Sequence, residues 1–269
     1  MTPETLQTRD GKTLTLRMCQ GFEELEACVR LQVETWGYAG GDIIRRRLFT
    51  VAQRIGGQAI GAFDHDNRMI GFAMSLPGLK PGKHAGDTPS PYLHSHMLAV
   101  LPAWRNSGIG RALKLYQRRE AIARSILLME WTFDPLEIKN AFLNIGKLGV
   151  IVRSYTPDFY GVSSSRLQAG LPTDRLHAEW WMESERVKAI LEGSSYSPPK
   201  IQETITVPNS VTEWKAGSVS KAQALQLENR HRFCDAFARG LAVIGFRVDA
   251  DGNGTYELAT LQHAGPELL

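Results

Sequence analysis

The sequence has few of the features that mark secreted, membrane-spanning or metal-binding proteins. Its three cysteines among 269 residues, Cys19, Cys28 and Cys234, are an odd number without metal-ligand spacing. This number and spacing of cysteines indicate a protein of a reducing compartment rather than one held together by disulfide bonds. No apolar run approaches the ~20 residues that a membrane-spanning helix needs, and residues 1–10 contain no apolar core of a secretion signal. We therefore expect a cytoplasmic protein with no membrane partner.

A long basic run is also absent. Lys and Arg total 31 against 28 Asp and Glu, for a formal net charge of +3. Dedicated nucleic-acid-binding proteins carry a concentrated basic surface, so no nucleic-acid partner is expected. Hydrophobic residues make up 43% of the chain, which is enough for a substantial core in one large domain or two small ones.

The periodicity of apolar residues predicts a mixed α/β (α+β) fold. Apolar patterning predicts strands at 12–18, 58–63, 69–76, 92–101, 125–133 and 150–155, and helical spacing predicts helices at 22–36, 42–54, 109–123 and 136–147. Asp42 is expected to cap the second helix, and the proline-containing stretch 79–91 is expected to be a surface loop. The order β-α-α-β-β-β-α-β-α-β indicates a mixed sheet with helices on its faces.

Residues 98–111 carry the most informative motif. They read Leu-Ala-Val-Leu-Pro-Ala-Trp-Arg-Asn-Ser-Gly-Ile-Gly-Arg, an apolar strand and a proline followed by Arg-x-x-Gly-x-Gly at the start of a helix. Gly108 and Gly110 lack a Cβ, so the chain can turn tightly and its amides can approach an oxyanion. The helix adds unpaired N–H groups and a partial positive charge of about half a unit. Together these features favour a pyrophosphate.

Two other phosphate-binding patterns do not fit. A dinucleotide-binding Rossmann unit places a third glycine three residues after the second, where this chain has Leu113, and it sits in repeated βαβ units. The stretch from Gly78 to His84 is one residue short of a P-loop and lacks its Ser or Thr. A nucleotide-dependent oxidoreductase is therefore disfavoured, and an ordinary glycine-containing β-α turn is the structural alternative.

The element order and the glycine turn after the fourth strand resemble the GCN5-related N-acetyltransferase (GNAT) superfamily from about Lys12 to Met182. The strongest part is Val100-Leu101-Pro102 followed by Arg105-x-x-Gly108-x-Gly110, which is similar to the family's acyl-coenzyme A pyrophosphate loop. Asn140-Ala141 and Lys147-Leu148-Gly149 are similar to a second family segment, although Val150 stands where Phe is usual.

The resemblance implies direct acyl transfer from an acyl-CoA to an amine in a ternary complex, without a metal. Backbone groups of Leu98, Ala99 and Val100 would bind the pantetheine arm, and one of their N–H groups would stabilise the oxyanion. The amides of Asn106, Ser107, Gly108, Ile109 and Gly110 would bind the pyrophosphate, with charge from Arg105 and Arg111. Asn140 would hydrogen-bond the arm or a buried polar group beside it.

Two histidines are candidates for the base that removes a proton from the incoming ammonium. His94 and His96 are two residues apart in a strand, so both imidazoles lie on one face. Histidine titrates near neutrality and suits this role. We favour His96, which is nearer the glycine turn, with Glu130 and Asp134 as reserves. The alternatives are hydrogen bonding within the sheet, or a metal pair, which the absence of closely spaced Cys or Asp/Glu disfavours.

The proton donor for the departing thiolate is harder to assign. The family often places a tyrosine about four residues past the asparagine, and this chain has Asn144 there. Tyr155 and Tyr160, just after the sixth strand, become candidates by proximity in sequence, and a packing or hydrogen-bonding role is the alternative for each. The missing tyrosine also supports a second function, an acyl-CoA-binding sensor or partner subunit without turnover.

We expect two regions, a GNAT-like acyl-CoA-binding core over 1–182 and an extension over 183–269. The extension is predicted to contain a short helix at 183–191, a strand at 204–207, a long helix at 219–239 and a closing hairpin. It is too small to count as an independent domain, so it is expected to pack on the core and shape the acceptor pocket. A dimerisation surface, and hence a homodimer, is the alternative. The acceptor, a small amine or a peptide terminus, stays open.

Overall fold

The first part of the chain, in which apolar residues alternate with polar ones, forms consecutive strands of one sheet. The computed structural model describes residues 2–8, 11–82 and 87–261, and the chain divides into two compact units. Unit 1 comprises Met1–Met129 and Ser164–Arg166, and unit 2 comprises Glu130–Ser163 and Leu167–Leu269.

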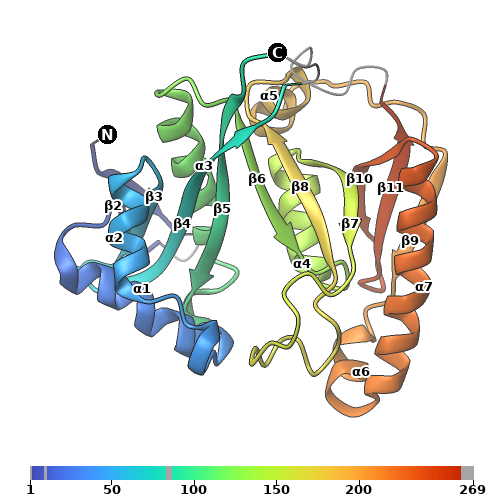
Figure 1. The fold of residues 1–269 in the computed structure, drawn as a ribbon, viewed down its shortest axis with the longest axis horizontal. Helices are drawn as coiled ribbons and strands as arrows, with labels where there is room; N and C mark the ends of the chain where they lie inside the picture. The colour runs from blue at the N-terminus through green and yellow to red at the C-terminus, as the bar shows by residue number, and fades with distance from the viewer. Residues whose placement is uncertain (1, 9–10, 83–86, 262–269) are drawn as a thin grey trace. The chain divides into compact units, whose positions relative to one another are not determined.

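The strands of unit 1 lie in sequence order, and each pairs antiparallel with the next (Figure 1). They are β1 (Glu4–Gln7), β2 (Thr13–Met18), β3 (Gln58–Phe63), β4 (Met69–Lys80) and β5 (Ser90–Val100). All of β3 is buried, as is β4 as far as Ser75, so both faces of the central strands are covered. In β5 the burial alternates, with Leu93, Ser95, Met97 and Ala99 buried.

Helices cover the central strands of unit 1 and supply most of its core. Helices α1 (Gly21–Trp36) and α2 (Arg46–Arg54) contact β3 and β4, and α3 (Ile109–Ile122) contacts β3, β4 and β5. The ring of Phe72 is fully buried and lies edge-on to Phe49 at 5.8 Å and to Trp36 at 6.4 Å between centroids. Such edge-to-face aromatic contacts join the two helices to β4.

Unit 2 contains the remaining strands, apart from the first two residues of β6, in the spatial order β6-β8-β7-β10-β11-β9. Their bounds are β6 (Leu128–Phe133), β7 (Ile151–Thr156), β8 (Arg175–Trp181), β9 (Glu203–Val207), β10 (Leu241–Val248) and β11 (Gly254–Thr260). The helical segments are α4 (Ile138–Ala141), a π-helical turn η3 (Phe142–Lys147), α5 (Glu185–Glu192), α6 (Val211–Gly217) and α7 (Val219–Ala238).

The C-terminal extension continues the sheet of unit 2. Strand β10 pairs antiparallel with β7, through Val243 opposite Val152, and α7 contacts β7, β9 and β10 (Figure 1). Phe233 of α7 is fully buried and lies edge-on to Tyr256 of β11 at 5.1 Å between ring centroids. The described part of the extension therefore packs on β7. The division into 1–182 and 183–269 remains a prediction.

The structure confirms the α/β (α+β) class with a mostly antiparallel sheet and corrects several details. Helix α2 begins after Arg45, so Asp42 is not its cap. The predicted helix 136–147 is one short α-helical turn followed by the π-helical turn η3. Strand β1 and helix α6 were not predicted, and part of the expected loop 79–91 lies outside the described residues. No helix in the described segments is long and apolar enough to cross a bilayer.

Replacing Phe72 should reveal how much the aromatic contacts stabilise unit 1. Because this side chain is fully buried, Phe72→Ala should lower the free energy of unfolding by about 3–5 kcal/mol through lost burial and a residual cavity. Val51→Ala, at an exposed position of α2, should change it by less than about 0.5 kcal/mol. Urea titration followed by circular dichroism measures both; equal losses would contradict the assignment of Phe72 to the core.

Candidate functional site

Of the two glycines in the turn between β5 and α3, Gly108 takes a left-handed conformation, whereas Gly110 lies within α3. The N–H of Leu101 donates to the carbonyl of Ile70 at 2.9 Å, which ends the pairing of β5 with β4. A short 3-10 turn (Pro102–Trp104) follows. Asn106 and Gly108 then take left-handed backbone angles, with φ of 63° and 90°. Alternation of this kind turns successive amides toward one side and forms a concave anion-binding nest.

The amides at the start of α3 lack helical acceptors. The N–H of Ala112 makes the first helical hydrogen bond, to the carbonyl of Gly108 at 3.0 Å, and no side chain caps the helix. Within the part of the chain that the structure describes, the backbone N–H groups of residues 106–111 have no acceptor. Unpaired amides together with the positive end of the helix dipole favour a negatively charged group.

Side chains around the turn hold its shape. Ser107 Oγ donates to the carbonyl of Trp104, and Lys12 Nζ lies 4.6 Å from the centroid of a Trp104 ring. Arg105 Nη2 donates to the carbonyl of Thr35 at 3.3 Å, near the negative end of α1. Arg105 therefore ties the turn to α1, in addition to contributing positive charge.

Backbone groups near the end of β5 alternate in direction. Leu101 and Ile70 form a hydrogen-bonded pair, so Ala99 and Phe72, two residues back on each strand, form the next one. Leu98 and Val100 occupy the intervening positions, and their N–H and C=O groups point away from β4. Of the three residues expected to bind the pantetheine arm, Ala99 is therefore the one whose backbone groups pair with β4.

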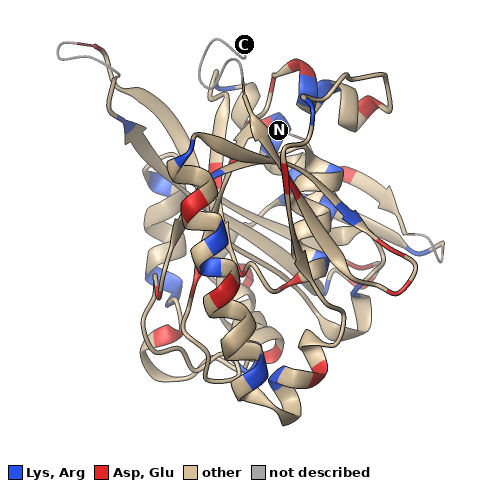
Figure 2. Ribbon diagram, turned by 90° about the vertical axis from the view of Figure 1, so that its right-hand side faces the viewer, with Lys and Arg blue, Asp and Glu red and all other residues tan. Residues whose placement is uncertain are grey.

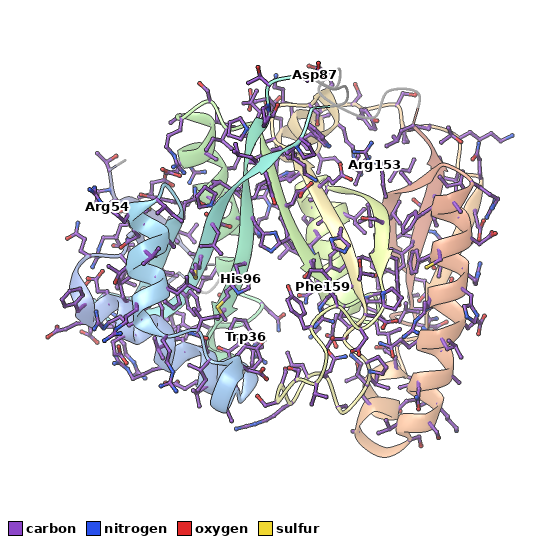
Figure 3. The ribbon with its side chains drawn as sticks, viewed as in Figure 1. Trp36, Arg54, Asp87, His96, Arg153 and Phe159 are labelled. Carbon is purple, nitrogen blue, oxygen red and sulfur yellow. The ribbon has the colours of Figure 1, made fainter. Side chains whose placement is uncertain are left out.

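His96 lies at an irregularity in β5. Met97 is opposite Met74 and Ser95 is opposite Ser75, so His96 is the extra residue of a β-bulge. Bulges re-aim side chains and are frequent beside active sites. His94 and His96 share the half-buried face of the strand, with ring centroids 6.0 Å apart; His96 is labelled in Figure 3. Burial lowers the pKa of His96 from its ordinary value of 6.5, because it penalises the charged imidazolium.

A buried polar seam lies beneath the bulge, and sequence reasoning missed it. Lys114 of α3 donates to Ser95 Oγ at 2.7 Å, and Ser95 Oγ donates to Gln117 Oε1 at 3.0 Å. Gln58 Nε2 donates to the carbonyl of Gln117 at 3.0 Å, and Ser75 Oγ donates to Gln58 Oε1 at 2.9 Å. Burial holds the pKa of Lys114 well below its usual range. The seam joins α3 to β3, β4 and β5.

In unit 2, Tyr155 is held in a buried ionic cluster. Its hydroxyl donates to Asp174 Oδ2, and Arg230 Nε and Nη2 donate to the same carboxylate at 2.9 and 2.8 Å. Burial and the neighbouring carboxylate raise the pKa of Tyr155. Since the hydroxyl proton is already donated to Asp174 and is held tightly, this arrangement favours the packing role for Tyr155 over proton donation.

Tyr160 belongs to a more accessible group, which we call the hydroxyl–aromatic cluster: Thr132, Thr156, Phe159, Tyr160 and His177. Tyr160 Oη and Thr132 Oγ1 are 2.9 Å apart, and Thr156 Oγ1 and His177 Nε2 are 2.8 Å apart. The ring of Phe159, which is labelled in Figure 3, lies edge-on to the rings of both Tyr160 and His177. His177 was missed, although the alternation in β8 places it on the half-buried face.

The remaining candidates differ in environment. Asn140 is exposed, whereas Asn144, at the position expected for a tyrosine, is buried within η3. Asp134 accepts hydrogen bonds from the Leu136 N–H at 2.8 Å and from Lys215 Nζ at 2.9 Å, so it is engaged at the start of the α4 segment. Glu130 is half-buried on β6.

Comparisons with known proteins give distant likenesses of fold. No protein-family model and no curated protein matches the sequence. The ribosomal-protein-S18-alanine N-acetyltransferase from Escherichia coli is similar with 15% identity and a TM-score of 0.47, covering 64% of this chain and 97% of that one. NAA60 from Arabidopsis thaliana, in complex with a bisubstrate analogue, is similar with 13% identity and a TM-score of 0.49, covering 63% and 99%.

A GNAT family acetyltransferase from Elizabethkingia anophelis with acetyl-CoA bound is similar with 13% identity and a TM-score of 0.44, covering 63% of this chain and 98% of that one. None of these likenesses carries a residue role to this chain. The chain itself has an α/β order of elements with a glycine-containing turn between β5 and α3.

The left-handed residue Gly108 offers a direct test of the anion site. A Cβ at this position would meet nothing within 4 Å, so the cost of Gly108→Ala comes from backbone strain of about 1 kcal/mol. Relief of that strain should rotate the neighbouring amides and weaken binding of inorganic pyrophosphate and coenzyme A at least about tenfold, as calorimetry would measure.

Gly40→Ala is the matched control for this change. Gly40 also has a positive φ, 56°, and open space around its Cβ position, but it lies before α2. Its substitution should cost similar stability and leave anion binding unchanged. Equal weakening in both variants would contradict a site at the turn.

Proposed function

We propose that the chain is an N-acyltransferase that transfers an acetyl or other acyl group from acyl-CoA to a primary amine by direct attack in a ternary complex. The observation that carries the proposal is the set of backbone amides at residues 106–111, between the end of β5 and the first turn of α3, which have no acceptor among the described residues. A turn with two left-handed residues before a helix N-terminus suits a pyrophosphate such as that of coenzyme A.

The donor would be bound along β5. The amides of Asn106 to Gly110 would hydrogen-bond the pyrophosphate, and Arg111 would add charge beside them. The N–H and C=O groups of Leu98 and Val100, directed away from β4, suit the amide groups of the pantetheine arm. One of these N–H groups would stabilise the oxyanion that forms when the amine attacks the thioester carbonyl carbon.

The base in this proposal is His96. An amine arrives as an ammonium and must lose a proton before its lone pair can form the new C–N bond. Because burial lowers the pKa of His96, the imidazole is neutral at pH 7 and able to accept that proton. When the tetrahedral intermediate collapses, the C–S bond breaks and the coenzyme A thiolate leaves with the electron pair.

The leaving thiolate then takes a proton. Tyr160 is the better candidate donor of the two tyrosines, since its side chain is 46% exposed and its hydroxyl contacts only Thr132 among the described hydrogen-bonding partners. Tyr155 is the weaker one, because its hydroxyl is bonded to Asp174.

A second function is favoured by one observation. The buried Asn144 stands where the family often has its tyrosine, and an amide side chain cannot donate a proton to a thiolate at neutral pH. A protein that binds acyl-CoA without turnover, as a sensor or partner subunit, would have the same anion site without this donor.

Two measurements on the whole chain separate these functions. Heat stability with and without acetyl-CoA reports binding, and thiol release from acetyl-CoA with a panel of small amines and peptides reports transfer. We expect both a raised melting temperature and amine-dependent thiol release. Stabilisation without release from any amine would favour the sensor, and the absence of stabilisation would overturn both functions.

His96 also determines the expected pH dependence. Protonated histidine cannot accept the amine's proton, so kcat/KM should fall as pH drops through a pKa below 6.5. His96→Ala should lower kcat by about 10²–10⁴-fold and change the acetyl-CoA dissociation constant by less than about twofold, as steady-state kinetics and calorimetry would measure. His231→Ala, at an exposed position of α7, should change neither. An unchanged kcat in His96→Ala would remove this residue from the mechanism.

A further inference from the structure

Three sulfur atoms lie together in the core of unit 1. The Sγ atoms of Cys28 and Cys19 are 4.0 Å apart, and the S–H group of Cys28 donates to Met69 Sδ at 3.7 Å. All three side chains are buried. They come from three elements of one compact unit, since Cys19 follows β2, Cys28 lies in α1 and Met69 is the first residue of β4. We call these three residues the sulfur cluster.

Hydrogen bonds hold the backbone on two sides of the sulfur cluster. The N–H of Cys19 donates to the carbonyl of Ala59 at 2.8 Å, and the carbonyl of Cys19 accepts from Gln53 Nε2 at 2.9 Å. Met69 lies opposite Phe63 in the antiparallel pairing of β3 and β4. The fold therefore fixes the positions of Cys19 and Met69 independently of the contacts between the sulfur atoms.

The spacing of the sulfur atoms fits a single metal ion. Metal–sulfur bonds of about 2.3 Å place three sulfur ligands about 4.0 Å apart when the ion lies in their plane. The separations of 4.0 and 3.7 Å in the cluster are close to that value. Thiolate and thioether ligands select soft ions such as Cu(I). Structural Zn²⁺ sites instead use four ligands from Cys, His and carboxylates, and no His or carboxylate of the described residues joins the two thiols in a cluster of three.

The protons and charges around the cluster suit an ion that binds sulfur strongly. Contact with Cys19 and burial both raise the pKa of the Cys28 thiol, so this thiol is protonated at neutral pH. A coordinated metal ion displaces such a proton to solvent. Cu(I) with two thiolates and a thioether carries one negative charge. The pKa of Arg17 is raised chiefly by its hydrogen bonds to Glu24 and also by Cys19, so its guanidinium lies near enough to Cys19 to offset that charge.

A cavity of about 320 Å³ borders the cluster on one side. Its wall includes Met69 and five charged residues, Glu23, Glu24, Arg30, Glu34 and Arg68. Three carboxylates against two guanidinium groups favour the entry of a cation. Because Met69 borders the cavity and also contacts Cys28, its thioether lies between the cavity and the buried thiols.

We propose that Cys19, Cys28 and Met69 form a binding site for one Cu(I) ion, independent of the proposed acyl transfer. On binding, two thiol protons pass to solvent, two bonds form between copper and the resulting thiolates, and a third forms to the thioether. The copper keeps its oxidation state. The bound ion joins β2, α1 and β4, so it should raise the melting temperature. Cysteine spacing alone misses the site, because the third ligand is a methionine 41 residues beyond Cys28.

Titration of the whole, reduced chain with Cu(I) against a chromogenic Cu(I) chelator, without oxygen, measures the stoichiometry and the affinity. We expect one Cu(I) per chain, a thiolate-to-copper charge-transfer band in the ultraviolet, and sulfur neighbours at about 2.3 Å by X-ray absorption. Affinity should rise about tenfold per pH unit for each thiol proton released. Zn²⁺ should bind more weakly, since a thioether suits it poorly. Absence of stoichiometric Cu(I) binding, or Zn²⁺ binding of equal affinity, overturns the proposal.

Matched variants assign the ligands. Cys28→Ala should weaken Cu(I) binding by more than about 100-fold, because a direct ligand contributes more than an outer-shell partner. Met69→Leu conserves the side-chain volume and should weaken binding about tenfold or more. Met74→Leu, at a fully buried position of the same strand, should not. Equal affinities in the two methionine variants contradict the site, and this comparison decides the matter even if Cys28→Ala fails to fold.

Cys234→Ala is the control for the thiols. Cys234 is exposed on α7, a helix whose ribbon carries residues of both charges (Figure 2). Its removal should leave the stoichiometry and the affinity for Cu(I) unchanged. Loss of the bound ion in Cys234→Ala, with binding retained in Cys28→Ala, would assign the copper to the exposed thiol and contradict the sulfur cluster.

Discussion

The buried polar seam between α3 and β5 is the constraint on which the proposed anion site depends. Leaving a polar group unpaired in the low-dielectric interior costs far more free energy than pairing it gains. Each hydrogen bond of the seam, from Lys114 to Ser75, therefore restricts the positions of the residues that it joins. The seam fixes where α3 lies along β5. Because the helix position is fixed, the short connection between Leu101 and Ile109 has to reverse sharply, and the left-handed angles at Asn106 and Gly108 provide that reversal.

The same seam bears on the bulge at His96. Ser95 is held from α3 and lies opposite Ser75, while Met97 pairs with Met74. His96, the extra residue between Ser95 and Met97, has no opposite residue on β4, and the strand bends there. One set of buried hydrogen bonds thus constrains both the start of α3 and the strand segment that carries the imidazole. Burial in the same seam holds the pKa of Lys114 well below its usual range.

The local pattern of apolar and glycine residues in the sequence predicted most strands and helices. It did not predict the roles of residues whose hydrogen-bonding partners lie far away in the sequence. Alternation located β2 to β5, and the glycine motif located the turn before α3. Asp42 has the composition of a cap, yet its carboxylate accepts hydrogen bonds from the N–H and hydroxyl of Ser164, a partner 122 residues away. Lys114 and Asp174 are charged residue types that sequence reasoning assigns to the surface. Their burial follows from tertiary contacts that no local window contains.

Unequal demands on the two proton transfers explain why the absence of a tyrosine at 144 does not by itself argue against transfer. A primary amine with a pKa near that of lysine, about 10.4, is almost entirely protonated at pH 7, so attack requires a base. A thiolate with a pKa of about 8.5 is a fair leaving group, and solvent can protonate it after the C–S bond breaks. In the proposed mechanism a neutral imidazole at position 96 would meet the larger demand, and a proton donor such as Tyr160 would contribute a smaller factor.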